Sequence, residues 1–155
     1  MKRKKVWRYY CDFCGKGGCS KPHMARHEKH CTKNPDRVCG MCDFLGLAQR
    51  PLGEILAEIP APPTKDELHG GCVSFNEPEV HIAPFRDATE GCPACILAAI
   101  RQSEWADSPV IQFNYNAEAK EVMNEHRYYN EQMINERDAE TAAGLRDWER
   151  RHGDS

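Results

Sequence analysis

The sequence lacks any long hydrophobic run. No apolar stretch approaches the roughly 18 residues of a membrane-spanning helix, and residues 1–7 are basic without the apolar centre of a secretory signal. There is also no glycine-rich phosphate loop, no nucleophile elbow and no His-Glu-x-x-His motif. We therefore expect a protein without membrane contact and without enzymatic activity.

Cysteine, by contrast, is abundant, with nine in 155 residues. An odd number without an export signal disfavours a disulfide scaffold, and most of the cysteines fall in clusters with the spacing of metal ligands. Bound metal can replace part of the hydrophobic core that a small domain lacks. We expect an intracellular zinc protein of a reducing compartment: the cytoplasm or nucleus, or the host cytoplasm if the protein is viral.

The net charge of −3 combines two regions of opposite sign. Residues 1–37 contain 11 Lys/Arg and 3 Asp/Glu, whereas residues 38–155 contain 10 Lys/Arg and 21 Asp/Glu. A basic segment attracts polyanions, although such a surface also keeps a small module soluble. Both interpretations of the basic segment stay open.

The basic segment contains one clear ligand pattern. It is Cys11-x2-Cys14-x12-His27-x3-Cys31, in which a Cys-x-x-Cys turn and a helix with donors at i and i+4 supply the four ligands of tetrahedral zinc. With Tyr9 before the first cysteine and Met24 before His27, residues 9–31 resemble a C2H2-type zinc finger in its CCHC variant. The resemblance implies two short strands followed by a helix.

The segment departs from the family pattern at Gly18 and at Pro22, and Pro22 forces a late start of the helix. Gly18 occupies the position of a large apolar residue, so Trp7, Tyr10 or Phe13 would have to fill the small core. His30 is an alternative last ligand. We expect Cys19 to be a small buried residue outside the site.

If the finger docks as the resemblance implies, DNA or RNA is its ligand. Arginine on the helix could contact guanine, and the other basic residues could contact phosphates. The candidate contacts are Lys2, Arg3, Lys4, Lys5, Lys21, His23, Arg26 and Lys29. Because one finger reads only about three base pairs, a protein-docking or purely structural role remains an alternative.

A second four-cysteine set consists of two Cys-x-x-Cys pairs. Cys39 and Cys42 form a knuckle-like turn, and Cys92 and Cys95 lie at the start of a helix over residues 96–105, where the helix dipole favours thiolates. With a hairpin predicted over residues 72–75 and 80–85, this region resembles a treble-clef zinc module. His69 with Cys72 is an alternative ligand pair, and a redox role for Cys92 and Cys95 is another alternative.

Zinc treble clefs also occur in HNH nucleases, which suggests a minor alternative. His81 on the second predicted strand would activate water. However, Val80 replaces the usual acidic residue, and a four-cysteine site leaves zinc no open position. A half-buried histidine on a strand is the simpler interpretation.

Two further helices are predicted outside the ligand pairs. Residues 51–59 form a short amphipathic helix, and residues 117–151 form one long helix or two with a break near Gly144. The long helix has few apolar residues, so we expect it to dock on the rest of the chain or on a protein partner.

Together these patterns predict an α+β fold of small zinc-stabilised modules with a long C-terminal helix. The expected domains are the basic arm and finger (1–37), the four-cysteine module (38–110) and the C-terminal helix (111–155), with two zinc ions. The expected function is a non-enzymatic adaptor that regulates through nucleic-acid binding by the finger. The alternative is a structural or assembly protein, such as a viral or phage virion component, that uses the C-terminal helix for protein contacts.

Overall fold

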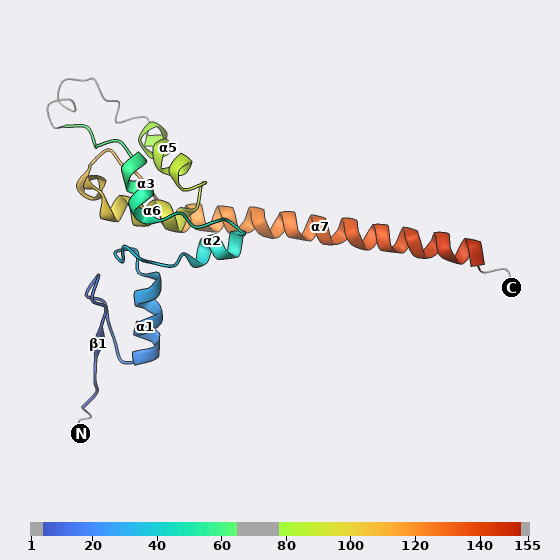
Figure 1. The fold of residues 1–155 in the computed structure, drawn as a ribbon, viewed down its shortest axis with the longest axis horizontal. Coiled ribbons are helices and arrows are strands. Elements are labelled where there is room, and N and C mark those ends of the chain that lie inside the picture. Colours follow the sequence, from blue (N-terminus) through green and yellow to red (C-terminus); the bar gives the residue numbers. More distant parts are fainter. Residues whose placement is uncertain (1–4, 65–77, 153–155) are drawn as a thin grey trace. The chain divides into compact units, whose positions relative to one another are not determined.

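The computed structural model describes residues 5–64 and 78–152 and has the expected α+β fold (Figure 1). The chain divides into two compact units, Met1–Tyr115 and Asn116–Ser155. Within the described residues, one two-stranded antiparallel sheet accompanies a set of helices. None of the helices in this part of the chain is long and apolar enough to cross a membrane.

The first unit begins with the two strands and the helix that the finger pattern predicts. Strand β1 (Tyr9–Tyr10) pairs with β2 (Gly17–Gly18) in antiparallel register, and helix α1 (Lys21–His30) follows. Ser20 caps α1 by accepting a hydrogen bond from the amide of His23 at 3.5 Å. Proline within the first turn is compatible with a helix start, because those amides have no partner inside the helix.

The small core of this module differs from the expectation. Met24 fills it together with the cysteines, and a Cβ atom at Gly18 would lie only 2.7 Å from Sδ of Met24. The absence of a side chain at Gly18 therefore makes room for methionine. The prediction that Trp7, Tyr10 or Phe13 fills the core is wrong, since all three side chains are exposed, and Cys19 is exposed as well.

The rest of the first unit is helical. It contains α2 (Gly40–Leu45), α3 (Leu52–Glu58), α5 (Pro78–Ala88), α6 (Pro93–Gln102) and the 3-10 helix η1 (Glu104–Asp107). Helix α3 confirms the predicted helix over residues 51–59. The predicted strand over residues 80–85 is wrong, because these residues lie in α5, and its partner at residues 72–75 lies outside the described residues.

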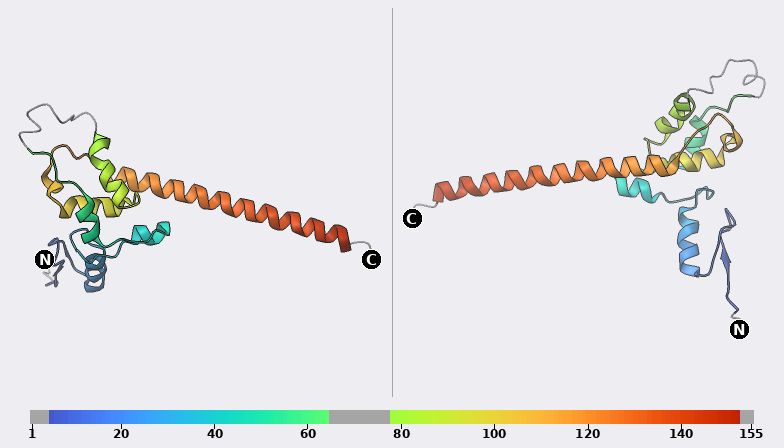
Figure 2. Two further views of the ribbon diagram at one scale, coloured as in Figure 1. Left: turned by 45° about the horizontal axis from the view of Figure 1, so that its top comes forward. Right: turned by 180° about the vertical axis from the view of Figure 1, so that it is seen from behind.

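The packing explains why residues 80–85 are helical. Ile82, Phe85 and Ala88 recur at three-residue intervals and are all buried, as expected for one face of a helix. Helix α5 packs against α3 and α6, and the three remain together in every view (Figure 2). Val80 is exposed, so it does not share a buried face with Ile82 as alternate residues of a strand would.

Trp105, in η1 just after α6, is part of this core. Its ring meets that of Phe85 edge-on, with centroids 5.7 Å apart, and its Nε1 donates to the carbonyl of Pro60 at 2.7 Å. The hydrogen bond satisfies the one polar atom of a buried indole. Trp105 thereby joins the segment after α3 to the α5 and α6 helices.

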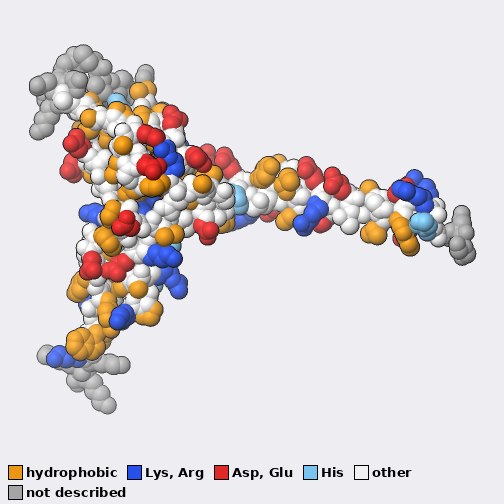
Figure 3. Space-filling model, in the orientation of Figure 1, with side chains coloured by type: hydrophobic (Ala, Val, Ile, Leu, Met, Phe, Trp, Pro, Cys, Tyr) orange, Lys and Arg blue, Asp and Glu red, His pale blue; other side chains and the backbone are white. Residues whose placement is uncertain are grey.

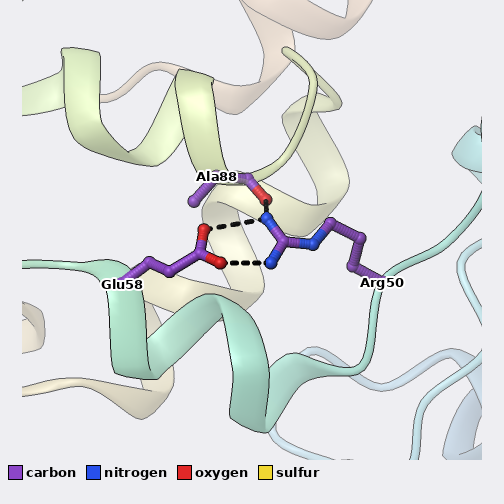
Figure 4. Close-up of polar contacts among 3 residues, drawn as sticks. All are labelled: Arg50, Glu58 and Ala88. Atoms are coloured by element: carbon purple, nitrogen blue, oxygen red, sulfur yellow. Dashed lines mark hydrogen bonds and ion pairs between the residues drawn. The ribbon is translucent and has the colours of Figure 1, made fainter.

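Arg50 provides a second link among these helices (Figure 4). Its guanidinium binds both carboxylate oxygens of Glu58 and also donates to the carbonyl of Ala88 at 3.1 Å. The hydrogen bond from Arg50 holds the pKa of Glu58 below its ordinary value. The ends of α3 and α5 are therefore joined by one side chain.

The second unit is formed by helix α7 (Tyr115–His152). It confirms the predicted long helix and continues through Gly144 without a break. Most of its apolar side chains are exposed, among them Met123, Tyr128, Tyr129, Met133, Ile134, Leu145 and Trp148. A helix of this kind buries little surface of its own.

Candidate metal centres

The first group of ligand atoms belongs to Cys11, Cys14, His27 and Cys31, and all of these atoms lie within 4.8 Å of one another. The hairpin supplies the first pair of cysteines. A tight turn, closed by the amide of Gly15 on the carbonyl of Cys11 at 2.9 Å, brings their sulfur atoms together. Gly15 has a φ of +71°, which favours glycine.

Helix α1 supplies the second pair. His27 and Cys31 are four residues apart, one at the last turn and one at the C-cap, and so they project from the same side of the helix. Nε2 of His27 lies 3.1 Å from Sγ of Cys14. For tetrahedral zinc the expected S···N separation is about 3.6 Å, so a small expansion of the group would accommodate the ion.

The electrostatic environment of this group favours a bound cation. The pKa of Cys14 is lowered to about 6 by hydrogen bonds from the backbone of Lys16 and from His27. Burial, conversely, raises the pKa of Cys31. The thiolate of Cys14 is thus stabilised without a metal, whereas the thiolate of Cys31 requires a nearby positive charge.

His30, the alternative last ligand, makes a different contact. Nδ1 of His30 lies 2.8 Å from the carbonyl oxygen of Val38, so the structure places His27 and not His30 among the ligand atoms.

The hairpin and helix α1 are also joined by a hydrogen bond outside the ligand group. Glu28 accepts it from the amide of Asp12 at 3.0 Å.

The second group joins Cys39, Cys42, Cys92 and Cys95, and all four side chains are buried. Sγ of Cys39 lies 3.7 Å from Sγ of Cys92, and Sγ of Cys42 lies 3.4 Å from Sγ of Cys95. These distances exceed a disulfide bond of about 2.05 Å and are close to the edge of about 3.8 Å of a tetrahedral zinc–thiolate site. The two pairs are 53 positions apart, and the fold brings them together.

Both cysteine pairs of this group start helices. Cys39 is the N-cap of α2, and its sulfur accepts a hydrogen bond from the amide of Cys42 at 3.4 Å. Cys92 is the N-cap of α6. The expected knuckle-like turn at Cys39 is therefore a short helix, and two helix N-termini direct positive dipole ends toward the sulfur atoms.

Four buried sulfur atoms cannot all be negative without compensation. Burial raises the pKa of Cys42 to about 12, and the hydrogen bond to Cys39 raises that of Cys92, whereas hydrogen bonds from Cys92 and Cys95 lower that of Cys39. A divalent cation among them would reduce the repulsion among four thiolates. All four donors are protein side chains, so such a site would be closed to water.

Arg37 is a functional residue that the sequence interpretation missed. Its side chain is only 6% exposed, and its Nη1 donates to Sγ of Cys95 at 3.5 Å. Burial lowers its pKa, but negative sulfur at Cys39 and Cys95 outweighs this effect and leaves the pKa raised. The only signal in the sequence is an arginine two residues before a Cys-x-x-Cys pair, and by local pattern it is one more cation of the basic segment.

The segment that contains Arg37 connects the two groups. Nε2 of Gln102 donates to the carbonyl of Thr32 at 2.7 Å, and Nη1 of Arg101 donates to Oγ1 of Thr32 at 2.8 Å. Gln49 in turn donates from Nε2 to the carbonyl of Arg37 at 2.6 Å. The linker between the two ligand groups is therefore hydrogen-bonded to α6 and to the loop after α2.

The structure places the remaining predicted residues as follows. Lys5, Lys21, His23, Arg26 and Lys29 are exposed on the N-terminal module, while Lys2, Arg3 and Lys4 lie outside the described residues, as do His69 and Cys72. The predicted strand at His81 is wrong, since His81 lies on α5, with its ring centroid 6.0 Å from that of Trp105. A thioredoxin-like redox pair follows a strand of a βαβ unit, whereas Cys92 and Cys95 follow helix α5.

Comparison of the chain with protein-family models, with curated proteins and with solved structures finds no match.

Proposed function

We propose that both groups bind zinc and that the chain is a non-enzymatic adaptor that binds nucleic acid through its N-terminal CCHC finger. Sulfur and imidazole donors in tetrahedral sets are the ligands that structural zinc prefers. Thiolate ligands persist in a reducing compartment, so we place the protein inside the cell.

The charge of the finger surface carries the nucleic-acid part of this proposal. The described residues 5–37 contain eight Lys/Arg against three Asp/Glu, and seven of the eight cations are exposed. Helix α1 has no acidic residue in its first turn. Lys21, His23 and Arg26 are all exposed there and are available to phosphates or bases.

The test is a binding titration of full-length protein that has been purified under reducing conditions, with zinc content measured on the same sample. We expect two zinc ions per chain and an affinity for nucleic acid that falls steeply with salt, because each neutralised phosphate releases counterions. Removing two contacts with Lys21→Ala/Arg26→Ala should lower the salt slope by about 2.

A matched control removes the same charge from another part of the molecule. Lys120→Ala/Arg146→Ala alters two exposed cations of α7, and this variant should bind like the wild type. Two zinc ions without salt-sensitive binding would refute the nucleic-acid role and leave the zinc assignment intact.

A structural or assembly role is the second candidate, and helix α7 is the observation that favours it. Met133, Ile134, Leu145 and Trp148 are each about half exposed or more, and such apolar residues mark protein contact sites. A chain ending at residue 115 should lose any self-association or partner binding seen by light scattering. A truncated chain that assembles like the full-length protein would exclude this role for α7.

A further inference from the structure

Aromatic side chains are exposed on the arm and hairpin of the N-terminal module. Trp7 is 84% exposed and Tyr10 is 58% exposed, and Phe13 at the turn is also exposed. The core of the module contains Met24 and the cysteines and includes none of these rings. The packing of the finger therefore does not use these rings. Exposed apolar groups of this kind indicate a binding surface.

The ring of Tyr10 lies against the backbone of a glycine on the neighbouring strand. Tyr10 pairs with Gly17 across the sheet, and a Cβ atom at position 17 would lie 2.8 Å from Cε1 and 3.1 Å from Cδ1 of the ring. The ring therefore lies directly over the Gly17 backbone. One side of the ring contacts the protein, and the rest of it is accessible for stacking.

The sequence around Trp7 and Tyr10 is basic, and the exposed Asp12 precedes Phe13. Lys5 and Arg8 flank Trp7 in the arm, Lys16 precedes β2, and residues 5–11 contain no acidic side chain. Lys5, Val6 and Trp7 line a hollow of about 230 Å³. Figure 3 shows hydrophobic and Lys/Arg side chains on the visible face of the N-terminal module, with Asp/Glu side chains among them.

This combination fits single strands better than a duplex. In a duplex the base faces are stacked on one another, so they are not accessible to protein rings, whereas single strands offer both base faces and phosphates. Binding of single strands typically combines aromatic rings for the bases with cations for the backbone. We propose that the N-terminal module binds single-stranded nucleic acid, with bases stacked on Trp7 and Tyr10 and phosphates held by Lys5, Arg8 and Lys16.

This inference rests on the proposed nucleic-acid function and names its ligand class. The experiment compares three fluorescein-labelled oligonucleotides of about 12 nucleotides with full-length, zinc-loaded protein by fluorescence anisotropy. They are a uridine RNA, a thymidine DNA and a DNA duplex of equal length. We expect one or both single strands to bind at least about tenfold more tightly than the duplex, and the RNA and DNA arms identify the natural class.

Two double variants separate stacking from charge. Trp7→Ala/Tyr10→Ala should weaken single-strand binding on the order of 10- to 100-fold, because each stacked base contributes substantially, while the salt slope stays unchanged. Trp7→Phe/Tyr10→Phe keeps an aromatic ring at each position and should retain most of the affinity. The matched control, Trp148→Ala/Tyr128→Ala, removes rings of similar exposure from α7 and should have no effect.

Zinc content of each variant verifies that the finger is intact. Equal or tighter binding of the duplex, or an alanine variant with unchanged single-strand affinity, would overturn the stacking proposal while leaving nucleic-acid binding in place. Absence of binding to all three oligonucleotides would instead refute the proposed function, so the two failures are distinguishable.

Discussion

The guanidinium of Arg37 donates a hydrogen bond to Sγ of Cys95, which lies 58 positions later in the chain, at 3.5 Å. It places a buried positive charge beside four sulfur atoms that a divalent cation alone would leave with a net charge of about −2. Arg37 also belongs to the linker from the N-terminal module. The charge balance of the second metal group therefore depends on a residue from outside both of its cysteine pairs.

Substitution of Arg37 should selectively weaken the second metal site. We expect Arg37→Met to lower zinc affinity at that site by about 10- to 100-fold, the usual effect of a residue that supports the ligands. The zinc affinity of Arg37→Lys should be intermediate, since lysine keeps the positive charge but not the planar set of N–H donors of the guanidinium group. Competition with a chromophoric chelator measures this, with Lys33→Met as the exposed control; equal zinc retention in Arg37→Met and Lys33→Met would contradict the prediction.

Removal of single cysteines should show that the two groups bind metal separately. Cys14→Ser should reduce the zinc content from two ions per chain to one, and Cys92→Ser should do the same and also unfold the helical core, because structural zinc contributes directly to folding. Cys19 is exposed and outside both groups, so Cys19→Ser should retain both ions. Elemental analysis with circular dichroism tests the set, and loss of zinc in Cys19→Ser would show that the ligand assignment is wrong.

The hydrogen bond of Trp105 should contribute measurably to stability. Trp105→Phe removes the donor to the Pro60 carbonyl and part of the ring that packs on Phe85. We expect the free energy of unfolding to fall by roughly 1–3 kcal/mol. Trp148→Phe on α7 should change it by less than about 0.5 kcal/mol; equal denaturation midpoints for the two variants would contradict the assigned role of Trp105.

Two glycines of helix α2 offer a matched test of backbone strain. A Cβ atom at Gly40 or at Gly46 would meet no other atom within 4 Å, but Gly46, the C-cap, has a φ of +70°. We expect Gly46→Ala to destabilise the fold by about 1 kcal/mol because the left-handed conformation disfavours a Cβ atom. Gly40→Ala should be neutral or slightly stabilising. Thermal unfolding in the presence of zinc compares them, and equal melting temperatures would argue against strain at residue 46.

The sequence alone determined those features that depend on neighbouring residues. The spacing of Cys11, Cys14, His27 and Cys31 predicted which side chains meet, because a turn and one helical turn fix their geometry over short distances. The long C-terminal helix was predicted for the same reason, since its residues favour a helix locally and no proline interrupts it.

Tertiary structure decided the features that depend on distant segments. Ile82 and Phe85 could belong to a strand or a helix by local pattern, and packing against α3 and α6 selected the helix. Only the folded chain shows that Met24 fills the space beside Gly18 and so leaves Tyr10 exposed. Likewise, nothing local distinguishes Arg37 from the surface cations around it. Its burial beside Cys95 results from the pairing of two segments that are far apart in the sequence.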